Sequence, residues 1–216
     1  MALAKPEMRH PLILPDGTAH KGNVFLRQVI DHPNIEIGDY TYAHDDRQPE
    51  DWATTLAPYL FPGAPERLKI GRFCQLAQGV QIVTSSANHD MRGLSTYPFP
   101  IFDPERFLSY ISSLPEGRDT VIGNDCWLGR EAMILPGARL GNGVIVGARA
   151  VVSGEVPDYA IVAGNPGKVV RMRLSDADIA RMLELAWWDW PIEAIEAAIP
   201  ALEKGDLAAL EALSPN

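Results

Sequence analysis

Apolar residues recur along much of the chain with a period of six. From Ile122 onward an aliphatic residue opens each of six consecutive hexapeptides, and Gly follows it in four of them. The same frame runs earlier through Ile70 and Leu76 to Ile82, and Ile37-Gly-Asp-Tyr-Thr-Tyr begins it further upstream. The fifth position is small or β-branched in every repeat. The first positions are Ile122, Leu128, Ile134, Leu140, Val146 and Val152, and the fifth positions are Cys126, Ala132, Ala138, Val144, Ala150 and Val156.

A period of six fits neither a helix, with about 3.6 residues per turn, nor the simple alternation of a half-buried strand. It predicts a chain that turns a corner every six residues, with Gly or Asn relaxing the backbone at the corners. Three hexapeptides then make one triangular coil, and stacked coils pair as parallel strands about 4.8 Å apart. The pattern therefore predicts an all-β repeat fold, a parallel β-helix, whose inward aliphatic residues form one apolar column.

Two long segments interrupt the hexapeptide frame. Residues 88–120 contain Asn88-His89, an aromatic stretch from Tyr97 to Phe102, and four prolines that prevent a long helix or a central strand. We expect an excursion loop here, and a loop of this length inside a compact domain is usually functional. Residues 43–67 are expected to form another excursion, which comes first along the chain, with a short helix near residues 49–59 that walls a pocket.

Helical spacing replaces the repeat after Arg173. Ser175 is placed to cap a helix, and a second amphipathic helix is expected to extend to about Leu213. The segment Trp187-Trp-Asp-Trp-Pro191 lies between them, and packing over the open end of the repeat is favoured over an aromatic platform for a sugar or base. The predicted organisation is a β-helix domain over residues 1–173 and a C-terminal helical cap over residues 174–216.

Composition narrows the classes of function. The 216 residues carry 19 Lys and Arg against 28 Asp and Glu, a formal net charge of −9, which argues against a nucleic-acid partner. No apolar run approaches the roughly 20 residues of a membrane helix, and residues 1–17 show no secretory pattern. We therefore expect a cytoplasmic protein without a membrane partner. Cys74 and Cys126 are too few for a disulfide framework, and we expect two reduced structural thiols.

His89 is the strongest catalytic candidate among the five histidines because it stands where an excursion leaves the repeat. The pKa of a free imidazole is about 6.5, so this group is suited to take a proton at neutral pH. The alternative is a zinc site, which some β-helix enzymes build from three histidines on neighbouring coils. No histidine follows His89, so that site would need His32 or His44 as well, and we expect no metal.

Several further motifs occur in a fixed order between about Gly38 and Asp206. They are Asn88-His89 with Ser95–Phe99, then Ile122–Gly129, Tyr159–Lys168 and Trp187–Pro191. Together these segments resemble the xenobiotic acetyltransferase family, which includes the hexapeptide-repeat chloramphenicol acetyltransferases and the streptogramin A (virginiamycin-type) acetyltransferases. The resemblance implies a left-handed β-helix, although the general rule for parallel crossovers favours the right hand. It also implies a homotrimer whose active sites lie between adjacent subunits.

The same resemblance implies an acetyl-CoA-dependent O-acetyltransferase that acts on a hydroxyl of an antibiotic or similar xenobiotic. His89 matches the general base, which would take the hydroxyl proton while the oxygen attacks the thioester carbonyl directly. Charged Lys and Arg suit the phosphates of CoA, and the N–H of Gly129 is a candidate donor to the thioester oxyanion. The matching positions are Trp127, Gly129, Ala148, Ser153, Lys168 and Arg171 for acetyl-CoA, and Tyr40, Tyr42, Tyr97, Phe99 and Phe102 for the acceptor.

One departure from the family pattern concerns the CoA contacts. Ser153-Gly154-Glu155 stands where the family usually has Thr-Lys-Asp, so one cation near CoA is missing, and Lys168 and Arg171 equally suit a solvated surface pair. Two other functions stay open, an O-acetyltransferase for a sugar or other endogenous hydroxyl and a non-enzymatic β-helix scaffold. The aromatic loop favours an apolar acceptor over a sugar, and the excursion with His89 favours an enzyme over a scaffold.

Overall fold

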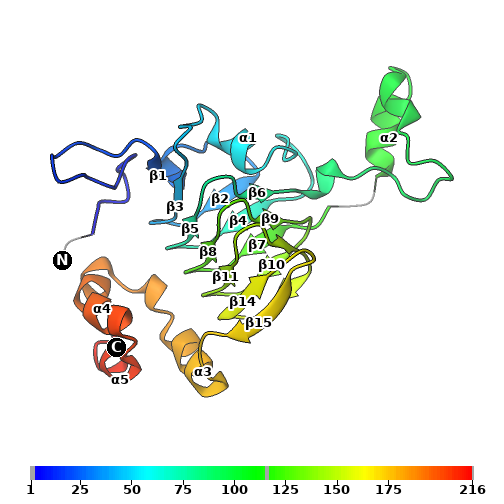
Figure 1. The fold of residues 1–216 in the computed structure, drawn as a ribbon. Coiled ribbons are helices and arrows are strands. Elements are labelled where there is room, and N and C mark those ends of the chain that lie inside the picture. The colour runs from blue at the N-terminus through cyan, green and yellow to red at the C-terminus, as the bar shows by residue number, and fades with distance from the viewer. Residues whose placement is uncertain (1–2, 115–116, 216) are drawn as a thin grey trace.

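The computed structural model describes residues 3–114 and 117–215 and consists of stacked coils of short strands, followed by helices (Figure 1). Successive strands of the coils belong in turn to three sheets, within which the coil strands pair in parallel. The three sheets form the three sides of a prism. This arrangement confirms the predicted parallel β-helix and, with the hexapeptide period, fits its left-handed form. The first side holds β2 (Ile35–Ile37), β4 (Leu68–Ile70), β7 (Thr120–Ile122), β10 (Arg139–Leu140) and β13 (Glu155–Val156). The second holds β3 (Tyr42–His44), β5 (Gln75–Leu76), β8 (Trp127–Leu128), β11 (Ile145–Val146) and β14 (Ala160–Ala163), and the third holds β6 (Gln81–Ile82), β9 (Met133–Ile134) and β12 (Val151–Val152).

The hexapeptide positions line the interior of the prism as predicted. From Ile122 to Val152 the six first-position side chains are at most 3% exposed, and from Cys126 to Val156 the six fifth-position side chains are at most 6% exposed. The register places like residues over one another, so that Leu128 pairs with its counterparts in the coils above and below. Burying each such aliphatic side chain contributes about 1.5–3 kcal/mol, and the column is therefore the main source of stability.

Asparagine and aspartate hold one corner of the prism together. Asn124 Oδ1 accepts a hydrogen bond from the Arg72 N–H at 2.7 Å, and Asn142 Oδ1 accepts from the Asn124 N–H at 2.9 Å. Asp158 Oδ1 continues the ladder by accepting from the Asn142 N–H at 2.6 Å. Gly123 precedes this corner because a Cβ there would lie 2.7 Å from the backbone of the next coil. The recurrent Gly-Asn pairs are thus explained by close coil-to-coil approach.

The two ends of the sheet on the second side are closed by antiparallel strands. β1 (Asn23–Phe25), followed by η1 (Leu26–Gln28), pairs with β3, and β15 (Lys168–Met172) doubles back onto β14. In the first coil a segment containing α1 (Trp52–Leu56) takes the place of a third strand, and the Asp51 carboxylate caps this helix by accepting from the Thr54 N–H. Trp52 and Leu56 are buried against the apolar column.

The second excursion leaves the prism after β6 and returns at β7. It contains η2 (Ser85–Ala87), η3 (Phe99–Phe102) and α2 (Phe107–Ser113), and α2 projects away from the coils at the right of Figure 1. The helical pieces are short, as expected for a segment rich in proline. Pro115 lies outside the described residues.

The C-terminal segment forms α3 (Asp176–Leu185), η4 (Trp187–Asp189), α4 (Ile192–Lys204) and α5 (Leu207–Ala212). Ser175 Oγ caps α3 by accepting from the Asp178 N–H. The expectation of one helix reaching Leu213 is wrong, because Gly205 ends α4 with φ +67° and the Asp206 side chain caps α5. No helix within the described ranges has the length and apolar character needed to cross a membrane.

The tryptophans of residues 187–190 form the core of this helical segment. Trp188 is 3% exposed, and Trp190 Nε1 donates to the Leu185 carbonyl oxygen at 2.7 Å. Trp187 contacts Phe73 with ring centroids 4.9 Å apart, and Phe73 lies at a corner between β4 and β5. The tryptophan segment therefore packs the helices along a corner of the coil stack, and the expectation that it covers the open end of the repeat is wrong.

Candidate active site

His89 lies at the start of the second excursion, two residues after η2, and its side chain is exposed. Its Nδ1 is 3.3 Å from the carbonyl oxygen of Thr96. Because a carbonyl oxygen only accepts, this hydrogen bond places the proton of the neutral imidazole on Nδ1. The lone pair is then on Nε2, which is the atom that can take a proton from a bound hydroxyl.

Three of the predicted acceptor residues form one aromatic cluster directly after Thr96. The ring centroid of Tyr97 is 4.7 Å from that of Phe99 and 5.6 Å from that of Phe102. All three side chains are more than half exposed. Because Thr96 also holds the imidazole of His89, the excursion brings a base and an apolar surface into one loop.

Tyr40 lies in a different aromatic group. Its ring stacks on Phe73 at 4.8 Å and meets Phe25 edge-on at 5.9 Å. Tyr40 therefore belongs to a series of contacting aromatic rings that ends at Trp187. Burial raises the pKa of the Tyr40 phenol. Tyr40 has φ 63° at a coil corner, and its role within one chain is to pack that corner. The structure does not bring it to the cluster of Tyr97.

Tyr42 shares a row with two of the predicted CoA residues on the second side of the prism. The register runs from Tyr42 through Gln75 to Trp127, and then through two isoleucines to Arg171. On β5, β8 and β11 the residue that follows each member of this row in the sequence is buried. The members of the row themselves therefore face outward. Trp127 is 50% exposed, which is unusual for so large an apolar side chain.

Lys168 and Arg171 are exposed on β15, opposite Ala163 and Ile161 of β14. Both cations therefore lie at the edge of the sheet that carries Trp127. Ser153 is exposed after β12 on the third side of the prism. It occupies the position equivalent to Val83, two coils away, from which the chain leaves toward His89.

Gly129 and Ala148 lie in successive coils at a tight corner. A Cβ on Gly129 would lie 2.7 Å from the Ala148 nitrogen, so only glycine permits this approach. The N–H of Gly129 donates to the Val146 carbonyl oxygen at 2.8 Å. The expectation that this N–H stabilises an oxyanion is therefore wrong, because the ladder between the coils already uses it.

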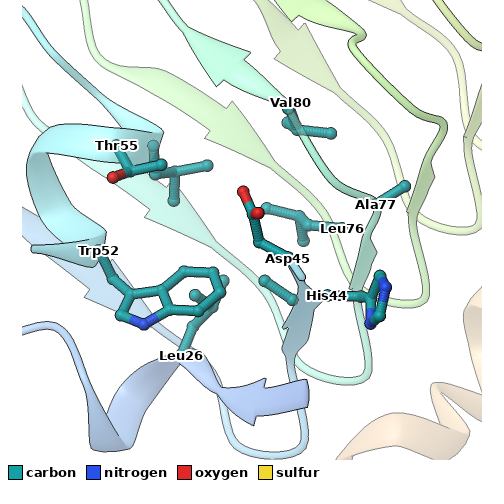
Figure 2. Close-up of a pocket in the computed structure, with 11 residues that line it drawn as sticks. Leu26, His44, Asp45, Trp52, Thr55, Leu76, Ala77 and Val80 are labelled. Carbon is teal, nitrogen blue, oxygen red and sulfur yellow. The ribbon is translucent and has the colours of Figure 1, made fainter. Parts of the chain in front are cut away.

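Two of the cavities among the described residues contact the segments discussed above, and neither is lined by His89. The smaller, of about 20 Å³, is formed between β3, α1 and β5, and Figure 2 shows the Asp45 carboxylate directed into it beside Trp52. It has room for about one water molecule, which is too little for a substrate. The Arg47 guanidinium holds the pKa of Asp45 below its usual range. A larger cleft of about 620 Å³ lies between the last coils and the C-terminal helices and is lined by Tyr159, Arg173 and Trp187.

The other predicted metal candidates are engaged in structural hydrogen bonds. His44 Nδ1 is 2.6 Å from Asn23 Oδ1, and His32 Nδ1 accepts from the Asn34 N–H at 3.1 Å. In the part of the chain that the structure describes, no three His, Cys, Asp or Glu side chains are grouped so that they could hold a metal ion.

Comparison with known proteins gives consistent matches over most of the chain. Residues 119–154 match the family model described as bacterial transferase hexapeptide (six repeats). Chloramphenicol acetyltransferase of Agrobacterium fabrum is 39% identical over 193 residues, which cover 87% of this chain and 90% of that protein. Chloramphenicol acetyltransferase of Escherichia coli is 38% identical over 88% of this chain and 91% of its own length. Virginiamycin A acetyltransferase of Staphylococcus aureus is 38% identical over 88% of each chain. On this similarity the chain is an acetyltransferase and belongs to the xenobiotic acetyltransferase family of hexapeptide-repeat enzymes.

Proposed function

We propose that this enzyme transfers the acetyl group of acetyl-CoA to a hydroxyl of chloramphenicol, a streptogramin A or a similar apolar xenobiotic. The observation that carries this proposal is the exposed imidazole of His89, with its Nδ1 held by Thr96 and an aromatic cluster in the same loop. The names of the relatives, chloramphenicol and virginiamycin A acetyltransferase, support the same class of acceptor.

The chemistry needs one base and no covalent enzyme intermediate. Nε2 of His89 takes the proton of the acceptor hydroxyl while its oxygen attacks the thioester carbonyl carbon. The carbon–sulfur bond then breaks, and the imidazolium returns the proton to the departing thiolate of CoA. The products are an acetyl ester and free CoA. General-base catalysis of this kind typically contributes about 10²–10⁴-fold to the rate.

Acetyl-CoA is proposed to lie along the second side of the prism. The exposed indole of Trp127 and the cations Lys168 and Arg171 share this side, and guanidinium and ammonium groups suit phosphates. The close-packed Gly129 and Ala148 lie at the next corner, where Ala148 is the exposed member of the pair. Ser153 completes the proposed contacts, and the acceptor is proposed to meet the aromatic cluster and Tyr42.

The proposed assembly is a homotrimer in which each site lies between two subunits. The excursion that carries His89 projects from its own prism in Figure 1 and exposes Met91, Leu94 and Leu108, each by 75% or more. Apolar side chains exposed to this extent are typical of a surface that another molecule covers. A cytoplasmic location is also proposed, and the buried free thiols of Cys74 and Cys126 suit a reducing compartment.

Release of free thiol from acetyl-CoA tests the function directly. The purified enzyme would be offered chloramphenicol, a streptogramin A, and maltose and galactose as sugar acceptors. We expect turnover with at least one of the two antibiotics and slower turnover with the sugars. Preference for a sugar would favour the endogenous-hydroxyl alternative, and failure both to turn over and to bind acetyl-CoA would favour a scaffold.

A further inference from the structure

Glu66 is a buried carboxylate at the root of the excursion that carries His89. It stands just before β4 and is 1% exposed. Its Oε1 accepts a hydrogen bond from the Ser86 N–H at 2.7 Å, and Ser86 lies in η2, three residues before His89. Its Oε2 is also buried and has no hydrogen-bond partner within residues 3–114 and 117–215.

Packing alone does not account for a glutamate here. A buried carboxylate with a single donor carries a large desolvation cost, which a buried apolar side chain would avoid. Such an under-satisfied group in a well-packed region calls for a specific explanation. The neighbours of Glu66 supply one, because they come from both limbs of the excursion.

The returning limb meets the same carboxylate. A Cβ on Gly117 would lie 2.7 Å from Glu66 Oε2 and 3.0 Å from the Cβ of Ser85, so the Gly117 backbone packs directly on both residues. The N–H of Arg118 donates to Ser85 Oγ at 3.2 Å. The outgoing and returning limbs, which are more than thirty residues apart in sequence, are therefore joined at Glu66.

The outgoing limb takes its direction from this contact. Thr84 precedes η2, but its side chain makes no capping hydrogen bond. The Glu66 carboxylate instead accepts from the Ser86 N–H in η2 and so takes the place of a local cap. The turn then continues through the Asn88 N–H, which donates to the Ser85 carbonyl oxygen at 3.0 Å. His89 is the next residue, so its backbone position follows from how η2 is held.

We infer that Glu66 is a positioning residue for His89, acting through Ser86 to hold the imidazole where it meets the acceptor hydroxyl. The inference rests on the proposed role of His89 as general base. Glu66 does not touch the reacting atoms, so its loss lowers kcat and leaves the KM for acetyl-CoA unchanged. A displacement of about 1 Å at a reacting group can cost about 10²-fold in rate, which sets the upper size of the effect.

Glu66→Ala, Glu66→Gln and a control variant test the inference. Glutamine keeps a carbonyl oxygen that can accept from the Ser86 N–H, so it should restore much of the activity that alanine loses. Asn142→Ala breaks the corner ladder in the later coils and controls for a general loss of stability. Each variant would be assayed for kcat and for the KM of acetyl-CoA at a temperature where circular dichroism shows it folded.

We expect Glu66→Ala to lower kcat by about 10–100-fold, at or below the limit for a misplaced group, with Glu66→Gln in between and Asn142→Ala near wild type. Hydrogen exchange of the peptide over residues 83–97 should speed up in Glu66→Ala only. Wild-type kcat in Glu66→Ala, or unchanged exchange in that peptide, would overturn the inference. If Glu66→Ala does not fold, Glu66→Leu, which has a similar size and also cannot accept from the Ser86 N–H, takes its place in both measurements.

A double variant separates this inference from the proposed function. In a His89→Ala background, Glu66→Ala should lower the residual turnover no further, because it acts through the imidazole. Independent losses would overturn the positioning role. If His89→Ala itself keeps its activity, the general-base proposal fails, and the exchange of residues 83–97 still reports whether Glu66 holds the loop.

Discussion

Trp127 and Leu128 are neighbours on β8, and their side chains lie on opposite faces of one wall of the prism. Leu128 is 0% exposed and belongs to the apolar column, whereas Trp127 is 50% exposed on the outward row that ends at Arg171. Successive side chains of a strand alternate between its faces, so adjacent positions serve stability and surface chemistry separately.

Leu128→Ala should lower the free energy of unfolding by about 2–5 kcal/mol, because it leaves a cavity in the column. Trp127→Ala should change it by no more than about 0.5 kcal/mol, as expected for a surface substitution, while raising the KM for acetyl-CoA. Urea denaturation of both variants at one protein concentration measures the difference. A larger loss of stability in Trp127→Ala would show that the indole is packed rather than available to a ligand.

His89→Ala should lower kcat by about 10²–10⁴-fold with little change in stability, since His89 is exposed and outside the column. His10→Ala is the matched control, because His10 contacts the Asn23 carbonyl oxygen in the N-terminal segment. Thiol release measures both. Turnover of His89→Ala within about threefold of wild type, far below the usual contribution of a general base, would assign the base to another group.

Lys168→Ala and Arg171→Ala should each weaken acetyl-CoA binding without affecting the KM for the acceptor. Loss of a direct hydrogen bond to a charged group costs about 1.5–3 kcal/mol. Lys204→Ala removes an exposed cation from the end of α4 and should have no effect. An unchanged KM for acetyl-CoA in both β15 variants would move the phosphate site to another part of the surface.

Phe102→Ala should raise the KM for the acceptor by several fold and leave that for acetyl-CoA unchanged. Its ring lies 5.6 Å from that of Tyr97, and an aromatic contact of this kind contributes about 0.5–1.5 kcal/mol beyond burial. Phe61→Ala removes a ring that is also more than half exposed, from the first excursion, and serves as the control. Equal effects of the two substitutions would argue against a specific acceptor surface.

Asp90 should titrate well below an ordinary carboxyl group. The Arg92 guanidinium hydrogen-bonds both of its oxygens, at 2.8 and 2.9 Å, and lowers the pKa of Asp90 to about 2. Any stabilisation by this pair is therefore complete above the unfolded pKa of about 3.9 and is lost as the pH falls toward 2. Carbon NMR of Asp90 in the wild type and in Arg92→Ala measures the shift, and an equal midpoint in both would contradict it.

The sequence by itself determined the coil architecture. Inward positions recur every six residues without a gap from Ile122 to Val152, and each one is buried because the period and the corner spacing coincide. The sequence also contains the signal that ends α4, because Gly205 stops this helix and Asp206 caps the next one. The apolar spacing by itself predicts one long helix, whereas Gly205 and Asp206 divide it into α4 and α5.

The tertiary structure alone decided which aromatic and acidic side chains meet. Tyr40 and Tyr42 are two residues apart, yet one packs against Phe73 at a corner and the other joins the row of Trp127. Nothing local in the sequence distinguishes them, because the residues that each one contacts come from the next coil. Glu66 meets Ser86 and Gly117 for the same reason: contacts between distant segments depend on how the coils stack, and no local pattern encodes them.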